Sequence, residues 1–232
     1  MQLHELNKLL NKLNLKFNNP TILQQAFYHR SYLNEVKLNI ESNERLEFLG
    51  DSVLSLVISN YLYLSRKNDT EGELTNLRAY IVKTNSLALA SKKLALGEYL
   101  YLSKGEEIGG GRENPQLLAN TYEAMLGAIY LDQDLEVVKE VIEKTLLTLF
   151  VSEIKSGPPK DAKSNLQEVV QEKLKESPHY KILGTKGPDH AKEFTVAVYV
   201  SGKEYGRGMG NSKQIAEEQS AEEALRKLSK EV

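Results

Sequence analysis

The most informative segment of the chain runs from Asn43 to Ser52 and reads NERLEFLGDS. Its acidic residues Glu44, Glu47 and Asp51 stand at positions i, i+3 and i+7, so on a helix they share one face. The positions around them are largely apolar, which predicts a helix packed against a core. Carboxylates beside a core are costly unless positive charge neutralises them. The segment therefore predicts oxygen ligands for a cation such as Mg²⁺, while a solvated acidic face is the ordinary alternative.

A second helix with polar residues among apolar ones is expected over residues 117–127. Asn120 and Glu123 stand at i and i+3 and share a face, and small residues nearby permit close approach of another helix. If the two helices pack together, Glu47, Asp51, Asn120 and Glu123 converge on one site. Four oxygen ligands, completed by water and phosphate, suit octahedral Mg²⁺ or Mn²⁺. Taken alone, Asn120 is more typical of a surface amide or a local cap.

The composition excludes several classes of protein. The chain has 232 residues, 41% of them hydrophobic, which is enough for one large domain or two ordinary ones. Its net charge of −2 provides no basic field typical of nucleic-acid binding. It has no cysteine, which excludes disulfides and thiolate metal sites and suits a reducing compartment. The N-terminus lacks the features of a secretory signal and no apolar run could cross a bilayer, so the expected location is cytoplasmic.

The hydrophobic pattern changes once along the chain. It is helical from Leu3 to about Ile154, including one continuous helix expected over 135–150, and then breaks at the linker-like sequence SGPPK. After the break, a strand is expected over 194–200 with a second strand returning over 203–209. The remaining expected elements are helices over 166–174 and 215–228. The predicted domains are therefore 1–155, mainly α; a linker, 156–160; and 161–232, a small α+β domain.

A family resemblance becomes visible once these motifs are placed in order. The sequence NERLEFLGDSVL, Asn43 to Leu54, resembles the signature of the bacterial ribonuclease III family. Three further segments match that family in order: 23–35, 71–82 and 104–132. The C-terminal part resembles a double-stranded RNA-binding domain, on the segments 163–168, 187–190 and 208–213. The resemblance implies an all-helical endonuclease domain followed by an α-β-β-β-α domain.

The resemblance also implies an activity and a site. A family member would be a homodimeric, Mg²⁺-dependent endonuclease cutting double-stranded RNA, with Mn²⁺ as a substitute and no organic cofactor or membrane partner. It would act in ribosomal and other RNA processing and leave 5′-phosphate and 3′-hydroxyl ends with a short 3′ overhang. The metal ligands would be Glu47, Asp51, Asn120 and Glu123, with Asp51 and Glu123 as catalytic acids. Phe48 would insert into the partner subunit, the alternative being an ordinary core residue.

The residues implied to contact RNA lie in both domains. They are Glu44, Glu71, Ser164, Gln167, Glu168, His190, Ser212 and Lys213. Double-stranded RNA exposes 2′-hydroxyls and phosphates, which polar and basic side chains of a small domain can contact. Without the resemblance, Glu71 would be taken as a solvated loop acid and His190 as a surface loop histidine.

Two features depart from the family pattern. Asn120 stands where aspartate is usual, which removes one formal charge and predicts weaker metal binding than in an Asn120→Asp variant. Gln214 stands where a second basic residue is usual, and residues 161–232 carry 12 basic and 12 acidic residues, so modest duplex affinity that depends on dimerisation is expected. Two alternatives stay open: a duplex-binding protein with weak or no cleavage, and a helical dimerisation scaffold. Cleavage is favoured because Glu47, Asp51 and Glu123 are all present.

Overall fold

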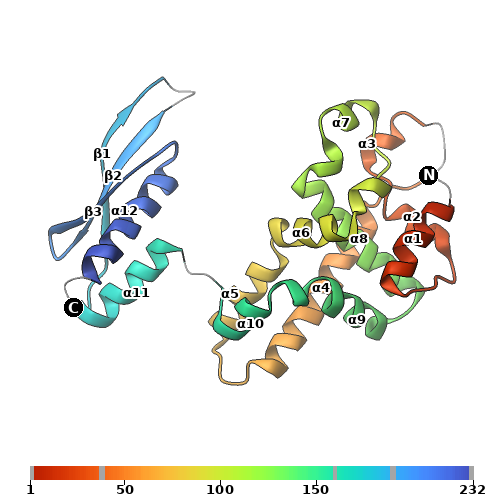
Figure 1. Cartoon of the computed structure of the whole chain (residues 1–232), viewed down its shortest axis with the longest axis horizontal. Coiled ribbons are helices and arrows are strands. Elements are labelled where there is room, and N and C mark those ends of the chain that lie inside the picture. The colour runs from red at the N-terminus through yellow and green to blue at the C-terminus, as the bar shows by residue number, and fades with distance from the viewer. Residues whose placement is uncertain (1–2, 37–39, 159–160, 189–191, 230–232) are drawn as a thin grey trace. The chain divides into compact units, whose positions relative to one another are not determined.

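The chain divides into two compact units, 1–158 and 159–232, each described by itself (Figure 1). The computed structural model describes residues 3–36, 40–158, 161–188 and 192–229. The first unit is helical, and the second combines a three-stranded sheet with helices. The expected fold class, a helical domain followed by a small α+β domain, is therefore confirmed. Among the described residues, no helix is both long and apolar enough to span a membrane.

The first unit consists of helices and short 3-10 turns joined by brief loops. In order these are α1 (Leu3–Leu13), α2 (Pro20–Gln25), α3 (Arg30–Leu33), α4 (Glu44–Ser65), α5 (Glu71–Val82), α6 (Thr84–Leu94), η1 (Leu96–Tyr99), α7 (Lys104–Ile108), η2 (Gly111–Glu113), α8 (Pro115–Asp132), α9 (Leu135–Thr145), η3 (Leu147–Leu149) and α10 (Val151–Ser156). Local chemistry explains several starts. The Asn114 side chain accepts hydrogen bonds from the first backbone N–H groups of α8, and Thr70 and Glu73 form a capping box on α5.

The continuous helix expected over 135–150 is wrong. The structure ends α9 at Thr145 and continues through η3 into α10. Leu146, Leu147 and Phe150 are all buried in the core. These residues continue the apolar pattern into the core, although the backbone leaves the regular helix at Leu146, whose φ and ψ are −117° and −57°. The apolar pattern alone therefore does not indicate where α9 ends.

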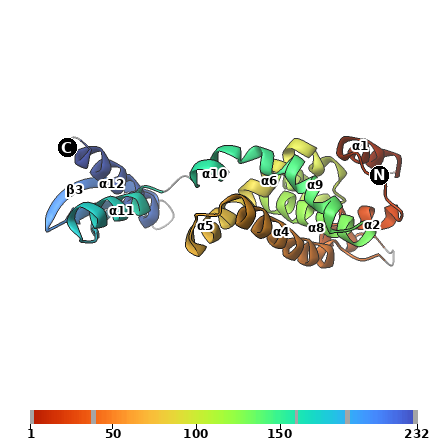
Figure 2. The ribbon, with the colours of Figure 1, turned by 90° about the horizontal axis from the view of Figure 1, so that it is seen from below.

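Helices α4 and α8 form the centre of the first unit and lie side by side (Figure 2). They touch through backbone, because glycine occupies both helices at the crossing. A Cβ atom on Gly50 would lie 1.8 Å from the carbonyl oxygen of Glu123, and one on Gly127 would lie 2.2 Å from that of Leu46. The predicted packing of the two acidic helices is therefore confirmed, and it is closer than any side chain would permit.

The second unit is a sheet with two helices on one face. Its elements are α11 (Ala162–Leu174), β1 (His179–Lys186), β2 (Glu193–Val200), β3 (Lys203–Gly210) and α12 (Lys213–Leu228). The strands are antiparallel in the order β1-β2-β3, which confirms the returning strand expected after β2. Helix α12 lies directly on β3, since a Cβ atom on Gly206 would be 2.1 Å from the carbonyl oxygen of Ser220. Leu166, Val198 and Ala221 belong to the small core between the layers.

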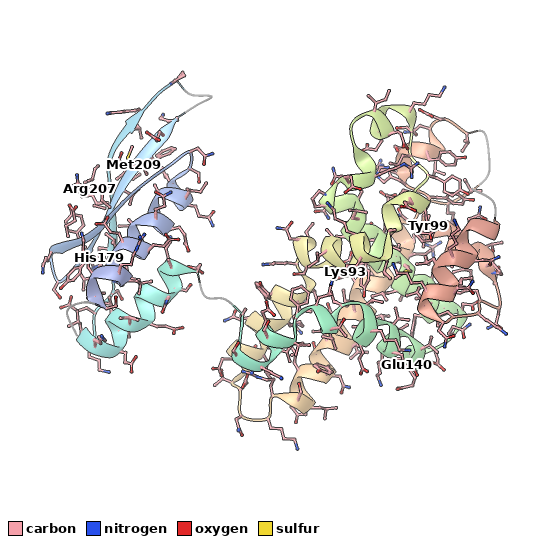
Figure 3. All side chains as sticks on the ribbon, viewed as in Figure 1. Lys93, Tyr99, Glu140, His179, Arg207 and Met209 are labelled. Atoms are coloured by element: carbon pink, nitrogen blue, oxygen red, sulfur yellow. The ribbon has the colours of Figure 1, made fainter. Side chains whose placement is uncertain are left out.

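Side chains of α12 cover the outer edge of β3. Figure 3 labels Arg207 and Met209. The backbone N–H of Arg207 donates to Glu223 at 2.8 Å, and that of Met209 donates to Gln219 at 3.2 Å. These are N–H groups that an edge strand would otherwise present for pairing. Two residues four positions apart on a helix are separated by about the same distance as two residues two positions apart on a strand. Gln219 and Glu223 can therefore both reach the N–H groups of Met209 and Arg207.

Candidate active site and RNA-binding surface

The start of α4 is held in place by Asn43, which is buried. Its backbone N–H donates to the carbonyl of Tyr28 at 2.8 Å, and its side-chain amide donates to the carbonyl of Ala26 at 3.3 Å. Its own carbonyl accepts from the N–H of Glu47 at 2.9 Å. The buried amide therefore ties the first turn of α4, and with it Glu47, to the preceding segment.

The contact between Gly50 and Gly127 brings the predicted carboxylates together. Glu47 and Asp51 lie on α4, and Glu123 lies on α8. Burial raises the pKa of Glu123 to about 7, and the charges of Asp51 and Glu47 add to this effect. Burial also raises the pKa of Glu47, with further contributions from Glu44 and Asp51, while a hydrogen bond from Asn120 acts in the opposite direction. The three acids thus share one electrostatic environment.

This negative charge is not compensated within the described part of the chain. No basic side chain there forms an ion pair with Glu47, Asp51 or Glu123, whereas Glu44 pairs with Arg30 at 3.3 Å. Within those same residues, no three His, Cys, Asp or Glu side chains are arranged to enclose a metal ion. By donor chemistry, the cluster fits a hard divalent cation.

A cavity of about 300 Å³ adjoins the cluster. It is lined by His29, Arg30, Asn43, Glu44, Glu47, Leu100, Leu117, Asn120 and Thr121. His29 caps α3, with Nδ1 accepting from the N–H of Ser31 at 3.3 Å, and burial lowers the pKa of His29. Sequence reasoning assigned no role to His29 or Arg30, although both lie in a segment that matched the family. Only the folded chain brings this segment beside α4 and α8.

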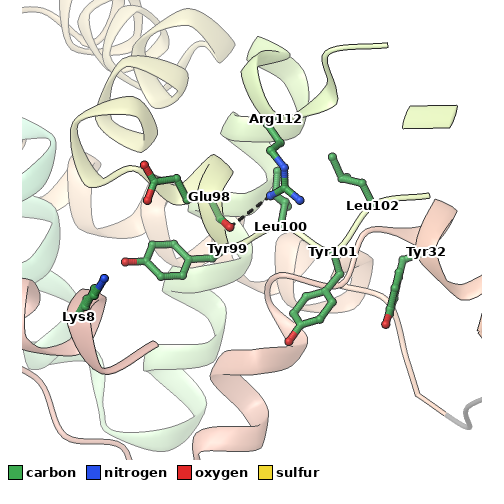
Figure 4. Close-up of a pocket in the computed structure, with 8 residues that line it drawn as sticks. All are labelled: Lys8, Tyr32, Glu98, Tyr99, Leu100, Tyr101, Leu102 and Arg112. Atoms are coloured by element: carbon green, nitrogen blue, oxygen red, sulfur yellow. Dashed lines mark hydrogen bonds between the residues drawn. The ribbon is translucent and has the colours of Figure 1, made fainter. Parts of the chain in front are cut away.

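A second cavity, of about 370 Å³, shares Leu100 with the first but has different chemistry (Figure 4). Tyr32 and Tyr101 pack against each other there, with ring centroids 5.2 Å apart. Arg112 donates to both oxygens of Glu107 and to the carbonyl of Glu98, the last at 3.2 Å. These interactions stabilise the turn that leads into α8, so this cavity supports the site indirectly.

Two predicted residues of the first unit lie outside the cluster. Phe48 is 78% exposed, which excludes the alternative that it belongs to the core of one chain. Glu71 lies in the first turn of α5 and accepts a hydrogen bond from Thr75 at 3.1 Å. It lines a groove with Tyr63, which lies about 24 Å along α4 from Glu47 at 1.5 Å per residue. One chain alone therefore does not bring Glu71 to the acidic cluster, and its role stays a prediction.

The predicted RNA contacts of the second unit lie on α11 and at the start of α12. Gln167 and Glu168 are exposed on α11. Lys213 is the exposed first residue of α12, which Ser212 caps by accepting from the N–H of Ile215 at 3.2 Å. Ser164 donates its hydroxyl to Asp161 at 2.8 Å. His190 lies outside the described residues, and the roles of all these residues stay predictions.

The acidic residues of α12 have partners within the domain. Lys163 pairs with Glu217 at 2.6 Å, and Glu218 accepts from the backbone N–H of Ala162. These bonds join the first turn of α11 to α12. Glu217 and Glu218 therefore connect the two helices that carry the predicted RNA contacts, and it is Glu217 that pairs with Lys163.

Comparison with known proteins agrees with this arrangement. Residues 19–149 match the family described as ribonuclease-III-like, and residues 162–228 match the double-stranded RNA binding motif. Ribonuclease 3 of Pelotomaculum thermopropionicum is 44% identical over 96% of this chain and 93% of its own length. Ribonuclease 3 of Geobacillus kaustophilus is 46% identical over 95% of this chain and 90% of its own length. The chain belongs to the ribonuclease III family.

A solved structure supports the fold of this ribonuclease III-type endoribonuclease. The nuclease domain of ribonuclease III from Campylobacter jejuni superposes with a TM-score of 0.59 at 36% identity, covering 63% of this chain and 99% of that domain. That domain shows structural flexibility in the region involved in its dimer formation. The likeness covers the part of the ribonuclease III chain that carries the acidic cluster.

Ionisation of Glu123 is expected to weaken the folded state of this ribonuclease III chain. Because its pKa is raised from 4.5 to about 7, the folded protein holds a proton that the unfolded chain releases, so stability falls as pH rises through that window. Between pH 5 and 8 the Tm of the native protein should fall relative to the Tm of the Glu123→Gln variant. The fall should be about 2 to 4 °C for each kcal/mol by which ionisation of Glu123 destabilises the fold. Thermal unfolding of both proteins across pH checks this. A constant difference in Tm would contradict it.

Proposed function

We propose that this chain cuts double-stranded RNA in a Mg²⁺-dependent reaction, with Mn²⁺ as a substitute. The products proposed are 5′-phosphate and 3′-hydroxyl ends with a short 3′ overhang, formed in the cytoplasm during processing of ribosomal and other precursor RNA. The observation that carries the proposal is the set of three uncompensated carboxylates on α4 and α8 beside a cavity. A protein that only bound duplex RNA would have no use for this costly arrangement.

In this mechanism, Glu47, Asp51 and Glu123 would hold the cation. When bound, a divalent ion screens the phosphate charge, lowers the pKa of a water nucleophile and stabilises the departing oxygen. The protein holds the carboxylates on two helices whose backbones touch, so their positions depend little on loop movement. Asn120 supports the ionised form of Glu47 by hydrogen bonding to it.

Incubation with a long synthetic RNA duplex tests this proposal. Cleavage is expected with Mg²⁺ or Mn²⁺ and not with chelator, and a single-stranded RNA of the same sequence should survive. Susceptibility of the products to phosphatase and their ligation behaviour report the end groups. Binding of the duplex without cleavage at any Mg²⁺ or Mn²⁺ concentration would favour the alternative, a duplex-binding protein.

We propose that the active form is a homodimer. The outward face of α4 exposes three large apolar residues, Phe48 at 78%, Leu56 at 57% and Tyr63 at 71%. Leu56 and Tyr63 also line a groove of about 610 Å³ that continues onto α5. Exposed apolar surface of this kind is typical of an interface. A two-fold dimer would place one site against each strand of a duplex, which accounts for an overhang.

Phe48→Asp should therefore shift the protein towards monomer. The change places a charge where a large apolar side chain would be buried between subunits, so dimer affinity should fall by about 10²-fold or more, the factor for roughly 3 kcal/mol. Sedimentation velocity over a concentration series measures this. Ile108→Asp is the matched control, because Ile108 is a similarly exposed apolar residue, at 88%, on a different helix, α7. An unchanged dimer in the Phe48 variant would exclude the α4 face as the interface.

Lys213→Ala should weaken duplex binding without changing its length preference. One phosphate contact contributes about one unit to the slope of log affinity against log salt concentration, so that slope should decrease by about one. Fluorescence anisotropy with a short duplex across salt concentrations measures the slope. Lys181→Ala on β1 serves as the control, because it removes the same charge from a different face of the domain. Equal effects of both variants would indicate a general charge effect and no contact by Lys213.

A further inference from the structure

The side-chain amide of Asn120 has a defined direction. Its oxygen Oδ1 accepts a hydrogen bond from Nε2 of Gln116 at 2.7 Å, one turn earlier on α8. Asn120 and Glu47 line the same cavity, and the side chain of Asn120 acts to lower the pKa of Glu47. Because Oδ1 of Asn120 accepts from Gln116, the amide nitrogen is the end of Asn120 left to donate to Glu47. The oxygen of Asn120 therefore faces Gln116, and its nitrogen faces the acidic cluster.

The orientation of Gln116 is itself biased by its neighbour. Oε1 of Gln116 accepts from the hydroxyl of Thr84 at 3.5 Å, a long and weak hydrogen bond at the first residue of α6. With its oxygen towards Thr84, Gln116 has only its NH₂ group to offer Asn120. Each side chain in the series thus donates to the next one, from Thr84 to Gln116, from Gln116 to Asn120, and from Asn120 towards Glu47. Reversing the amide of Asn120 would set two NH₂ groups against each other.

We propose that Gln116 is a positioning residue that keeps Asn120 as a hydrogen-bond donor to Glu47 and keeps its oxygen away from a bound cation. The inference rests on the proposed metal site. It assigns cation binding to Glu47, Asp51 and Glu123, with Asn120 outside the ligand set while Gln116 is in place. The amide would become a fourth oxygen ligand only after turning over, at the expense of the bond from Gln116.

The proposal distinguishes asparagine from aspartate at this position. A carboxylate has two equivalent oxygens, so the new side chain of an Asn120→Asp variant could accept from Gln116 with one oxygen and face the cation with the other. Gln116 would then have no orientation to enforce. Removal of the Gln116 amide should therefore change the affinity for the cation when residue 120 is asparagine. It should have no such effect in the Asn120→Asp variant.

Binding of Mn²⁺ alone to the full chain, without RNA, tests this by isothermal titration calorimetry. The four proteins are the native chain, Gln116→Met, Asn120→Asp and the double variant; methionine keeps the length and helix propensity of glutamine without its hydrogen bonds. Gln116→Met should raise Mn²⁺ affinity roughly three- to tenfold beside Asn120, the range that one released hydrogen bond supplies. It should give no increase beside the Asn120→Asp substitution.

Comparing Gln116→Met with asparagine and with aspartate at position 120 distinguishes an effect on the orientation of the Asn120 amide from a general effect of Gln116 on the structure. Equal changes in both backgrounds, or unchanged or weaker binding in the single Gln116→Met variant, would overturn the proposal. Gln116 is exposed, so the variants are expected to fold, and thermal unfolding without metal confirms this. If the native chain cuts duplex RNA and this comparison shows no difference, the inference alone fails. If the native chain neither binds Mn²⁺ nor cuts, the proposed function fails with it.

Discussion

Glu123→Gln should reduce cleavage of duplex RNA by about a thousandfold or more while the protein remains folded. A bound cation contributes several kcal/mol of charge stabilisation at the phosphate, and about 1.36 kcal/mol corresponds to each factor of ten in rate. Glu123 is the acid whose pKa is raised most clearly by burial and by the other two acids, so its ionised form is unfavourable and would be stabilised by a bound cation. Glutamine has the same shape, removes that charge and loses one strong oxygen ligand. Single-turnover cleavage of a labelled duplex measures the loss.

Two controls make this result specific. Glu140→Gln makes the same change at an exposed residue of α9, where the carboxylate only pairs with Lys144 at 3.4 Å, and should leave cleavage unchanged. The Glu123 variant should also bind duplex RNA as well as the native chain and unfold at a higher temperature above pH 7. Cleavage within about tenfold of the native rate, a loss of only about 1.4 kcal/mol, would remove Glu123 from the catalytic set.

Gly127→Ala should destabilise the first unit by about 3 kcal/mol or more and inactivate the enzyme. The added methyl group would lie 2.2 Å from the backbone carbonyl oxygen of Leu46, which cannot move like a flexible side chain. Overpacking a close-packed core usually costs about 1–3 kcal/mol, and a backbone clash at a helix crossing lies at or beyond the upper end. The helices would have to separate, and with them Glu47 and Glu123. Urea denaturation and cleavage assays report both consequences.

Gly72→Ala is the matched comparison for this variant. Gly72 also lies in a helix, α5, but nothing lies within 4 Å of the position its Cβ would occupy. Alanine there should be neutral or stabilising by roughly 0.5–1 kcal/mol because glycine is a poor helix former. Equal stability of the Gly72 and Gly127 variants would show that the backbone contact between α4 and α8 is not tight in solution.

The two acidic helices were predictable because their chemistry is local. Glu47 and Asp51, like Asn120 and Glu123, are separated by three or four residues, so one helical turn places each pair on one face. Small residues in the second helix indicated that another helix could approach closely. Strand β2 follows from the β-branched and aromatic residues of 194–200 in the same direct way, whereas no residue pattern placed β1, which only the family resemblance implied.

Other features depend on tertiary contacts that no local pattern contains. The α-helix ends at Thr145 although Leu146, Leu147 and Phe150 continue the buried apolar pattern. His29 reaches the cavity beside Glu47 only because Asn43 ties α4 to the segment before α3. The direction of the Asn120 amide depends on Gln116 and Glu47, of which only the first is a near neighbour in sequence. The separation of Glu71 from the cluster follows from the length of α4.

The outer edge of β3, which side chains of α12 cover, affects whether copies of this domain associate when they are close together. Two subunits bound to one duplex would hold their small domains at a high effective concentration. An exposed edge strand would then favour pairing between the two chains. Gln219 and Glu223 accept from the backbone N–H groups of Met209 and Arg207, so these two groups are not available to pair with another strand. The opposite border, β1, carries Lys181 and Lys186, whose charges discourage the same association. Both borders of the sheet thus carry features that oppose pairing between copies of this domain.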